Sequence, residues 1–118
     1  MPNRKWNRMR KDYLAITTNT GLIFAKRSDI LYCLSDGAYC NIYLLGGRKL
    51  TVSKNLKEVE TTLDDDRFYR IHHSHLINLD HVYSYLNNQQ NCVKMSNGEE
   101  LAVARTRKKG FLELFVKL

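Results

Sequence analysis

The chain has 118 residues, of which 43% are hydrophobic, and it carries a formal net charge of +7. This length fits one small domain, and the apolar content, which includes 7 Tyr and 4 Phe, excludes an intrinsically disordered chain. A balance of 19 Lys and Arg against 12 Asp and Glu indicates a polyanionic partner, either nucleic acid or an anionic membrane surface.

The first eleven residues are polar and basic, with no apolar period and no acidic residue among them. We interpret residues 1–11 as a basic linker or flexible arm and residues 12–118 as the domain. The cations of this arm are Arg4, Lys5, Arg8, Arg10 and Lys11.

Short strands separated by turns follow the arm. The Asn19-Thr20-Gly21 segment predicts a hairpin, Asp36-Gly37 predicts a turn, and Gly46-Gly47 predicts a tight turn between strands. The strands expected around these turns are Tyr13–Thr18, Leu22–Ala25, Ile30–Ser35, Tyr39–Leu45 and Lys49–Ser53.

One internal helix is expected over Asn55–Leu63. Asn55 and Glu58 have the spacing of a capping box, in which each side chain accepts a hydrogen bond from the other residue's backbone amide. Leu56, Val59 and Leu63 form an apolar stripe along one helix face.

The rest of the chain predicts further strands and a final helix. Thr106 is expected to cap that helix, which would run to Leu118, and Gly110 should weaken it. The expected strands are Phe68–Ile71, His75–Asn78, Val82–Leu86, Cys92–Met95 and Glu100–Val103.

No segment alternates a strand with a long helix, as a parallel sheet would require. The predicted fold class is therefore mainly β: small antiparallel sheets with one short internal helix and a C-terminal helix.

The charges are unevenly distributed along the chain. Five acids lie within a stretch of nine residues that covers the internal helix and the turn after it. Four cations lie near the C-terminus. We therefore expect one basic and one acidic face. The acids are Glu58, Glu60, Asp64, Asp65 and Asp66, and the cations are Arg105, Arg107, Lys108 and Lys109.

Cys33, Cys40 and Cys92 are odd in number and lack Cys-x-x-Cys spacing. We interpret them as buried free thiols in a reducing cytosol. No apolar run reaches membrane-spanning length and no signal core is present, so the expected localisation is cytoplasmic.

The segment from Phe68 to Leu79 resembles the central motif of the LytTR family of bacterial DNA-binding domains. That motif has an aromatic residue, an Arg, a His, a Ser and then an ending of two apolar residues and an Asn; here the letters are FYRIHHSHLINL. Three flanking segments agree in order and interval: Ile30–Tyr39, Ser53–Glu58 and Asn97–Arg105. The resemblance covers roughly Tyr13 to Leu114.

The resemblance implies small antiparallel sheets whose loops, rather than a recognition helix, enter the major groove of double-stranded DNA. Members usually follow a phospho-receiver domain in two-component response regulators, and they commonly bind two direct-repeat half-sites as a pair. The implied function is sequence-specific DNA binding for transcription regulation, with possible self-association on DNA, with no cofactor and without catalysis.

Four residues are candidates for contact with base edges. The family places its base-reading Arg at Arg105, where a guanidinium can donate two hydrogen bonds to guanine O6 and N7. His73 stands where the family has a polar or basic contact residue, and imidazole can donate or accept. Tyr39 matches the contact position before the fourth strand, and Asn41 lies on the same strand face. Tyr39 could equally pack on the sheet.

Five further residues suit contacts to phosphate groups, which fix register and supply affinity. Lys108 also gains from the positive end of the final helix. The set is Arg70, Ser74, Lys54, Arg107 and Lys108. His72 and Asn78 match the motif too, but we expect both to hold the loop through hydrogen bonds to the backbone. We also expect Arg105 and the His73 turn to lie on the same side of the molecule.

Two other function classes and a metal site are alternatives. A basic surface with histidines could serve a nuclease by general acid–base chemistry, although no second catalytic constellation is evident. A protein-interaction module is the third class. His72, His73, His75 and His81 could bind a metal, but neighbouring side chains in a strand should diverge, which argues against that site.

Overall fold

The computed structural model describes residues 12–87 and 90–118. The expected arm at residues 1–11 lies outside these ranges, so the division between arm and domain stays a prediction. Within the described residues, no helix is long and apolar enough to cross a membrane.

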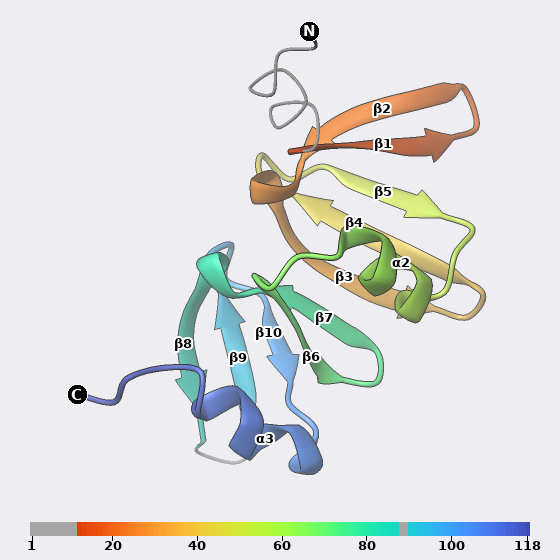
Figure 1. Ribbon diagram of the computed structural model, residues 1–118. Coiled ribbons are helices and arrows are strands. Elements are labelled where there is room, and N and C mark those ends of the chain that lie inside the picture. The colour runs from red at the N-terminus through yellow and green to blue at the C-terminus, as the bar shows by residue number, and fades with distance from the viewer. Residues whose placement is uncertain (1–11, 88–89) are drawn as a thin grey trace, which may run out of the picture.

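Five strands form the central sheet, in the spatial order β5-β4-β3-β7-β6, and all neighbouring pairs are antiparallel. The bounds of these strands are β3 Ile30–Asp36, β4 Tyr39–Leu44, β5 Lys49–Val52, β6 Phe68–His72 and β7 His75–Asn78. Two smaller sheets flank it (Figure 1). One is the hairpin of β1, Tyr13–Thr18, and β2, Gly21–Lys26, and the other has the order β10-β9-β8, with β8 Val82–Leu86, β9 Cys92–Met95 and β10 Glu100–Ala102.

Two α-helices complete the fold, α2 at Leu56–Leu63 and α3 at Arg105–Leu112. Short 3-10 turns at Arg27–Asp29 and Leu79–His81 lead into β3 and β8. The capping box of α2 is confirmed: the Asn55 side chain accepts from the Glu58 amide, and the Glu58 carboxylate accepts from the Asn55 amide. Asp64 ends α2 in the left-handed conformation, and Arg27 Nε donates to the Leu63 carbonyl at 3.1 Å.

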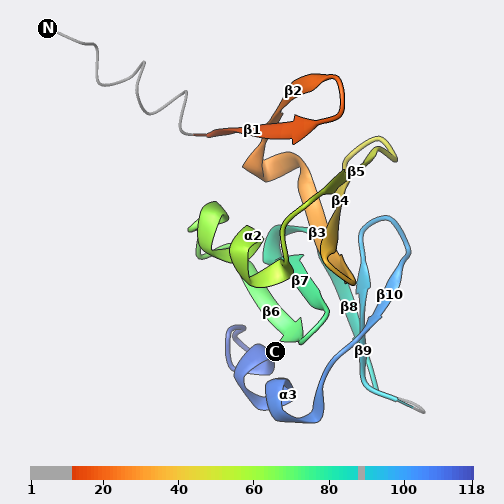
Figure 2. The ribbon, with the colours of Figure 1, turned by 90° about the vertical axis from the view of Figure 1, so that its right-hand side faces the viewer.

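The central sheet is covered on both faces, because its strands bury alternate side chains in two different cores (Figure 2). The first core lies towards α2 and the β1–β2 hairpin, and it includes Ile16, Cys33, Ile42, Leu63 and Leu76. The second core lies towards β8–β10 and α3, and it includes Tyr32, Ile71, Ile77, Met95 and Phe111.

The mainly β fold class is confirmed, and most strand boundaries agree with the prediction to within a residue or two. The acids of α2 and the cations of α3 lie on opposite sides of the central sheet, as the charge pattern predicts. The three cysteines are buried and free, as expected. A hydrogen bond with Cys40 and burial raise the pKa of the Cys33 thiol, so this thiol stays protonated.

The prediction for the final helix is wrong at both ends. The helix begins at Arg105 after Ala104, which takes an extended backbone conformation and offers no side-chain cap, so Thr106 lies inside the helix. It ends at Leu112 rather than Leu118. Phe111 is buried, whereas the apolar side chains that follow are largely exposed, although the Phe115 ring still packs edge-on against Phe111. Those exposed residues are Leu112, Leu114, Phe115, Val116 and Leu118.

Candidate nucleic-acid interface

Three loops that are far apart in the sequence lie along one edge of the molecule. They are the β3–β4 turn at residues 36–39, the β6–β7 turn at residues 72–75 and the start of α3 at Arg105, and we call them together the loop edge. Figures 1 and 2 both show the three following one another, with the loop edge towards the right in Figure 1 and towards the viewer in Figure 2.

Backbone hydrogen bonds hold the loop edge together. The Ser35 amide donates to the Ser74 carbonyl at 3.0 Å, which joins the β3–β4 turn to the β6–β7 turn. The Ala104 amide donates to the Ile71 carbonyl at 2.8 Å, which fixes the residue before Arg105 beside the end of β6. The expectation that Arg105 and the His73 turn share one side of the molecule is therefore confirmed.

Two side-chain hydrogen bonds also hold the β6–β7 turn, one within the turn and one to β10. His72 Nδ1 accepts from the Ser74 amide at 3.1 Å, and His75 Nδ1 lies 2.9 Å from the Ala102 carbonyl oxygen, to which it donates as the protonated nitrogen. Asn78 is fully buried, donates to the Ile30 carbonyl at 2.9 Å and accepts from the Asp80 amide. The expected backbone hydrogen bonds of both residues are confirmed, but only His72 holds the β6–β7 turn, because Asn78 lies at the opposite end of β7 and joins it to the start of β3.

The His72 ring lies close to two other imidazoles of this turn: it stacks on His75 and is tilted against His73. The ring centroids of His72 and His73 are 4.4 Å apart, as are those of His72 and His75. The prediction that His72 and His73 diverge is wrong, because β6 ends at His72 and strand alternation does not extend into the turn. His72 and His75 are direct partners across β6 and β7. In the described part of the chain, no three His, Cys, Asp or Glu side chains are arranged to hold a metal ion.

Burial lowers the pKa of His72, and the positive charge that His75, His73 and Arg70 can carry lowers it further. This depression favours the neutral imidazole, in which Nδ1 keeps its lone pair for the Ser74 amide. The turn is therefore held by a neutral histidine near pH 7.

The predicted base-contacting residues differ in how free their side chains are. Arg105 and His73 are exposed, and Tyr39, beside the β3–β4 turn, is 52% exposed. Asn41 is more engaged: its Oδ1 accepts from the Thr51 hydroxyl at 2.6 Å, and its Nδ2 lies 3.5 Å from the Asp36 carboxylate. The loop edge thus brings Arg105, His73 and Tyr39 together, while Asn41 lies behind them on the sheet.

The predicted phosphate-contacting residues fall into two groups. Arg107, Lys108 and Ser74 lie on or beside the loop edge. Because Ala104 contributes no side-chain acceptor, the first amides of α3 keep donors available at its positive end.

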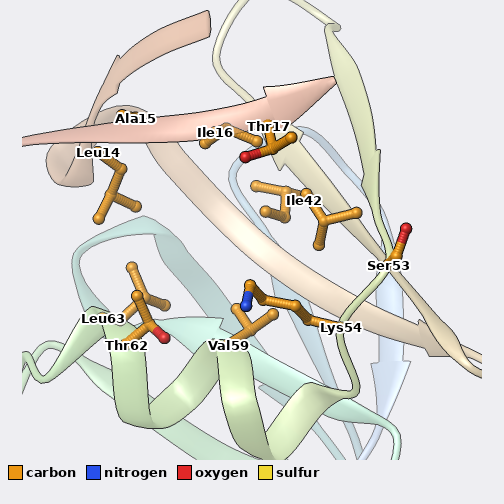
Figure 3. A pocket seen from close by; sticks show the side chains of 11 residues that line it. Leu14, Ala15, Ile16, Thr17, Ile42, Ser53, Lys54, Val59, Thr62 and Leu63 are labelled. Carbon is orange, nitrogen blue, oxygen red and sulfur yellow. The ribbon is translucent and has the colours of Figure 1, made fainter. Parts of the chain in front are cut away.

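Arg70 and Lys54 are placed differently from the first group. The Arg70 side chain is 18% exposed; Nε donates to the His72 carbonyl at 3.1 Å, one terminal nitrogen donates to the His73 carbonyl, and the other pairs with Glu60 at 3.2 Å. Lys54 follows β5 and extends into a groove between β1 and α2 (Figure 3). A phosphate contact by either residue stays a prediction that requires its side chain to move.

Sequence reasoning missed several residues that build this edge. Ser35, Ala102 and Ala104 act through backbone atoms, which leave no side-chain signature. Glu60 belongs to an acidic run that suggests a solvated helix face, yet it pairs with Arg70. Nothing in the local sequence indicates that pairing, because the two residues meet only through the fold.

The chain was compared with known proteins. A family model described as the LytTr DNA-binding domain matches residues 20–115. A sensory transduction protein LytT from Bacillus subtilis is 26% identical over 104 residues, which cover 86% of this chain and 42% of the relative. A protein of the same name from Oceanobacillus iheyensis is 25% identical over 117 residues, which cover 96% of this chain and 48% of the relative.

A solved structure has a similar fold. It is a LytTr DNA-binding domain from a methyl-accepting/DNA response regulator of Bacillus cereus, with a TM-score of 0.75 and 23% identity, covering 87% of this chain and 95% of the other. The chain spans less than half the length of the two curated relatives. The family match covers most of the domain and includes the whole loop edge. This chain belongs to the LytTr DNA-binding domain family.

Proposed function

We propose that the loop edge reads the major groove of double-stranded DNA and that no helix enters that groove as a reading element. Arg105 donates to a guanine, while His73 and Tyr39 contact neighbouring base edges. The observation that carries this proposal is the pair of backbone hydrogen bonds, Ser35 to Ser74 and Ala104 to Ile71, that brings three exposed side chains to one edge.

Affinity that does not depend on sequence comes from cations near the same edge. Arg107 and Lys108 lie in the first turn of α3, where the helix dipole also favours a phosphate. Arg70 holds the β6–β7 turn and adds positive potential beside it, and Ser74 can donate its hydroxyl. Lys54 reaches a phosphate only by leaving its groove, and Asn41 reaches a base only by giving up its bond to Thr51.

The parent protein is inferred to be a cytoplasmic response regulator of a two-component system. The relatives are named sensory transduction proteins and are more than twice as long as the matched region, which leaves room in them for a receiver domain. Two copies of the domain would occupy paired direct-repeat half-sites, with self-association on DNA.

We further propose that the domain acts by binding and not by catalysis. His72 Nδ1 accepts from the Ser74 amide, and His75 Nδ1 donates to the Ala102 carbonyl, so both rings are bonded to the backbone. This engagement of the rings supports a structural role for the histidines of the turn.

Selection from a random duplex library tests the proposal, because sequences enriched by the wild-type domain define its site. Arg105→Ala should then bind that site about 1–3 kcal/mol more weakly and lose discrimination at one base pair. Lys109→Ala, one residue beyond the first turn of the same helix, is the matched control and should keep the sequence preference. Full selectivity in the Arg105 variant would refute the reading role, and cleavage of the duplex without added metal would refute the non-catalytic role.

A further inference from the structure

An apolar groove lies between the β1 strand and α2, on the face of the molecule away from β8–β10 and α3. Its volume is about 320 Å³. In Figure 3, strand β1 forms one wall, α2 forms the other, and the β4 and β5 strands lie behind. The loop edge takes no part in this groove.

The walls of the groove are mainly aliphatic. Leu14 and Ile16 project from β1, Ile42 projects from β4, and Val59 and Leu63 project from α2. A concave aliphatic surface of this volume matches the lower end of the range for small-molecule sites.

The polar side chains of the groove are one lysine and a few hydroxyl residues. The Lys54 side chain crosses the opening, and its ammonium group lies in the space between β1 and α2 (Figure 3). The hydroxyl groups of Thr17 and Thr62 line the groove from opposite walls. Lys54 forms no ion pair among residues 12–87 and 90–118, and the neighbouring acid Glu58 is engaged by the Asn55 amide. The lining therefore supplies one positive charge and hydroxyl donors, and no acidic side chain.

The wall formed by β1 precedes residues 20–115, which the family model matches. This wall therefore lies outside the residues that the family model matches, whereas the opposite wall, α2, lies within them. A ligand held there does not depend on DNA contact at the loop edge.

We propose that the groove binds a small amphipathic carboxylate, with an unbranched aliphatic tail between β1 and α2 and its carboxylate at the Lys54 ammonium. The aliphatic walls bury the tail at about 25 cal/mol per Å² of apolar area removed from water. The single cation and the hydroxyls complement one monoanionic head group, which selects against an amine or a neutral head on the same tail.

Decanoate is the probe, compared with decanol and decylamine below the concentrations at which they self-assemble. Two-dimensional amide NMR of the whole domain, without DNA, reports both the site and the affinity. The proposal expects saturable decanoate shifts in β1, the β5–α2 connection and α2, and weaker binding of decanol and decylamine. Lys54→Gln should weaken decanoate binding by about 2- to 5-fold, as for a partly exposed ion pair. Lys57→Gln, on an exposed position of α2 outside the groove, should bind as the wild type does.

A second variant tests the place of the ligand independently of its charge. Thr62 is exposed on α2 at the groove opening, so Thr62→Trp should fill the opening, leave the fold intact and abolish decanoate binding. Equal binding of decanol and decanoate with no effect of Lys54→Gln would overturn the proposal. So would shifts centred on α3 or β9, or the lack of saturable decanoate binding.

Discussion

Arg70 and Arg105 are both arginines, but they differ in burial and therefore in the role that each side chain can have. Three guanidinium nitrogens of Arg70 are bonded to the carbonyls of His72 and His73 and to Glu60, so this side chain shapes the β6–β7 turn. Arg105 is exposed at the start of α3, and its guanidinium carries five hydrogen-bond donors. Replacing an arginine that shapes a loop should lower the stability of the domain. Replacing an arginine that reads a base should lower the affinity of the domain for DNA.

Lys108 should contribute to affinity and not to selectivity. Its ammonium group lies in the first turn of α3, where it can neutralise one phosphate. We expect Lys108→Ala to weaken binding to cognate and random duplexes alike. It should also reduce the slope of the logarithm of the binding constant against the logarithm of the salt concentration by about one unit. Binding titrations at several salt concentrations measure both effects. An effect confined to the cognate duplex would contradict the phosphate role.

His72 should make the stability of the domain depend on pH. Its pKa is lowered in the folded state, so its contribution is fully present above the ordinary histidine pKa of about 6.5 and is lost as the pH falls through the folded value. Urea unfolding at pH 7.5 and 5.5 should show a larger acid loss in the wild type than in His72→Asn, where Asn keeps an acceptor for the Ser74 amide.

His73→Gln serves as the control for the pH experiment, since this neighbouring histidine is exposed. It should retain most of the acid loss of the wild type, because burial of His72 lowers its pKa more than the charge of His73 does. If His72→Asn loses as much stability on acidification as the wild type does, the pH dependence arises elsewhere.

The sequence predicts the candidate contact residues of the interface, but it does not predict how the fold brings them together. The FYRIHHSHLINL segment and the position of Arg105 indicate the contact residues through a family resemblance. The proximity of Arg105 to the His73 turn depends on backbone atoms of Ile71 and Ala104, so no side-chain pattern encodes it. The sequence did not predict the contact between the His72 and His73 rings, because β6 ends at His72 and the alternation of side chains in a strand does not continue into the turn.

At the scale of the elements, α3 shows why a helix with a glycine near its end forms here. A Cβ atom placed at Gly110 would lie 2.5 Å from the Tyr69 hydroxyl oxygen, which is closer than real Cβ contacts. Gly110 therefore allows α3 to approach β6 closely, and Phe111 beside it is buried in the second core. The glycine weakens the isolated helix but allows its packing.

A double-mutant cycle tests this close approach. Gly110→Ala gains about 1 kcal/mol of helix propensity but overpacks the contact, which costs about 1–3 kcal/mol, so we expect a net loss of stability. Tyr69→Phe removes the clashing hydroxyl, and in that background Gly110→Ala should be stabilising. Urea unfolding of the four proteins gives the coupling energy, and additive effects would show that the contact does not limit the helix.

Strands were easier to predict than their pairing. Turn residues such as Asn19-Thr20-Gly21 mark where strands end, and alternating side chains mark the strands themselves. The order of the central sheet places β7 between β3 and β6, and the β3–β7 pair joins segments about forty residues apart. The local sequence pattern contains no information about this strand pairing, because the pairing depends on how the whole chain buries both faces of the sheet.

At the scale of the whole molecule, the central sheet couples two cores. Strands β3, β4, β6 and β7 contribute side chains to both, so neither core can lose its order without exposing one face of the shared sheet. The β1–β2 hairpin and α2 on one side, and β8–β10 and α3 on the other, should therefore unfold as one cooperative unit.

Large-to-small substitutions in the two cores test this coupling. Leu63→Ala in α2 and Met95→Ala in β9 should each lower the free energy of unfolding by about 2–5 kcal/mol. Far-ultraviolet and near-ultraviolet circular dichroism should report the same midpoint for each variant, because Tyr32 and Tyr43 pack in the second core. Separate midpoints in the Leu63 variant would mean that the two layers unfold independently.

The main-chain bonds Ser35 to Ser74 and Ala104 to Ile71 also bear on how such regulators diverge. An amide and a carbonyl remain whatever side chain their residues carry, except that proline lacks the amide. Under the proposed reading mode, mutation at positions 39, 73 and 105 alters the preferred operator while the backbone that holds the three positions stays unchanged. Descendants of one ancestral domain could in this way acquire different target promoters by a few substitutions, without rebuilding the scaffold.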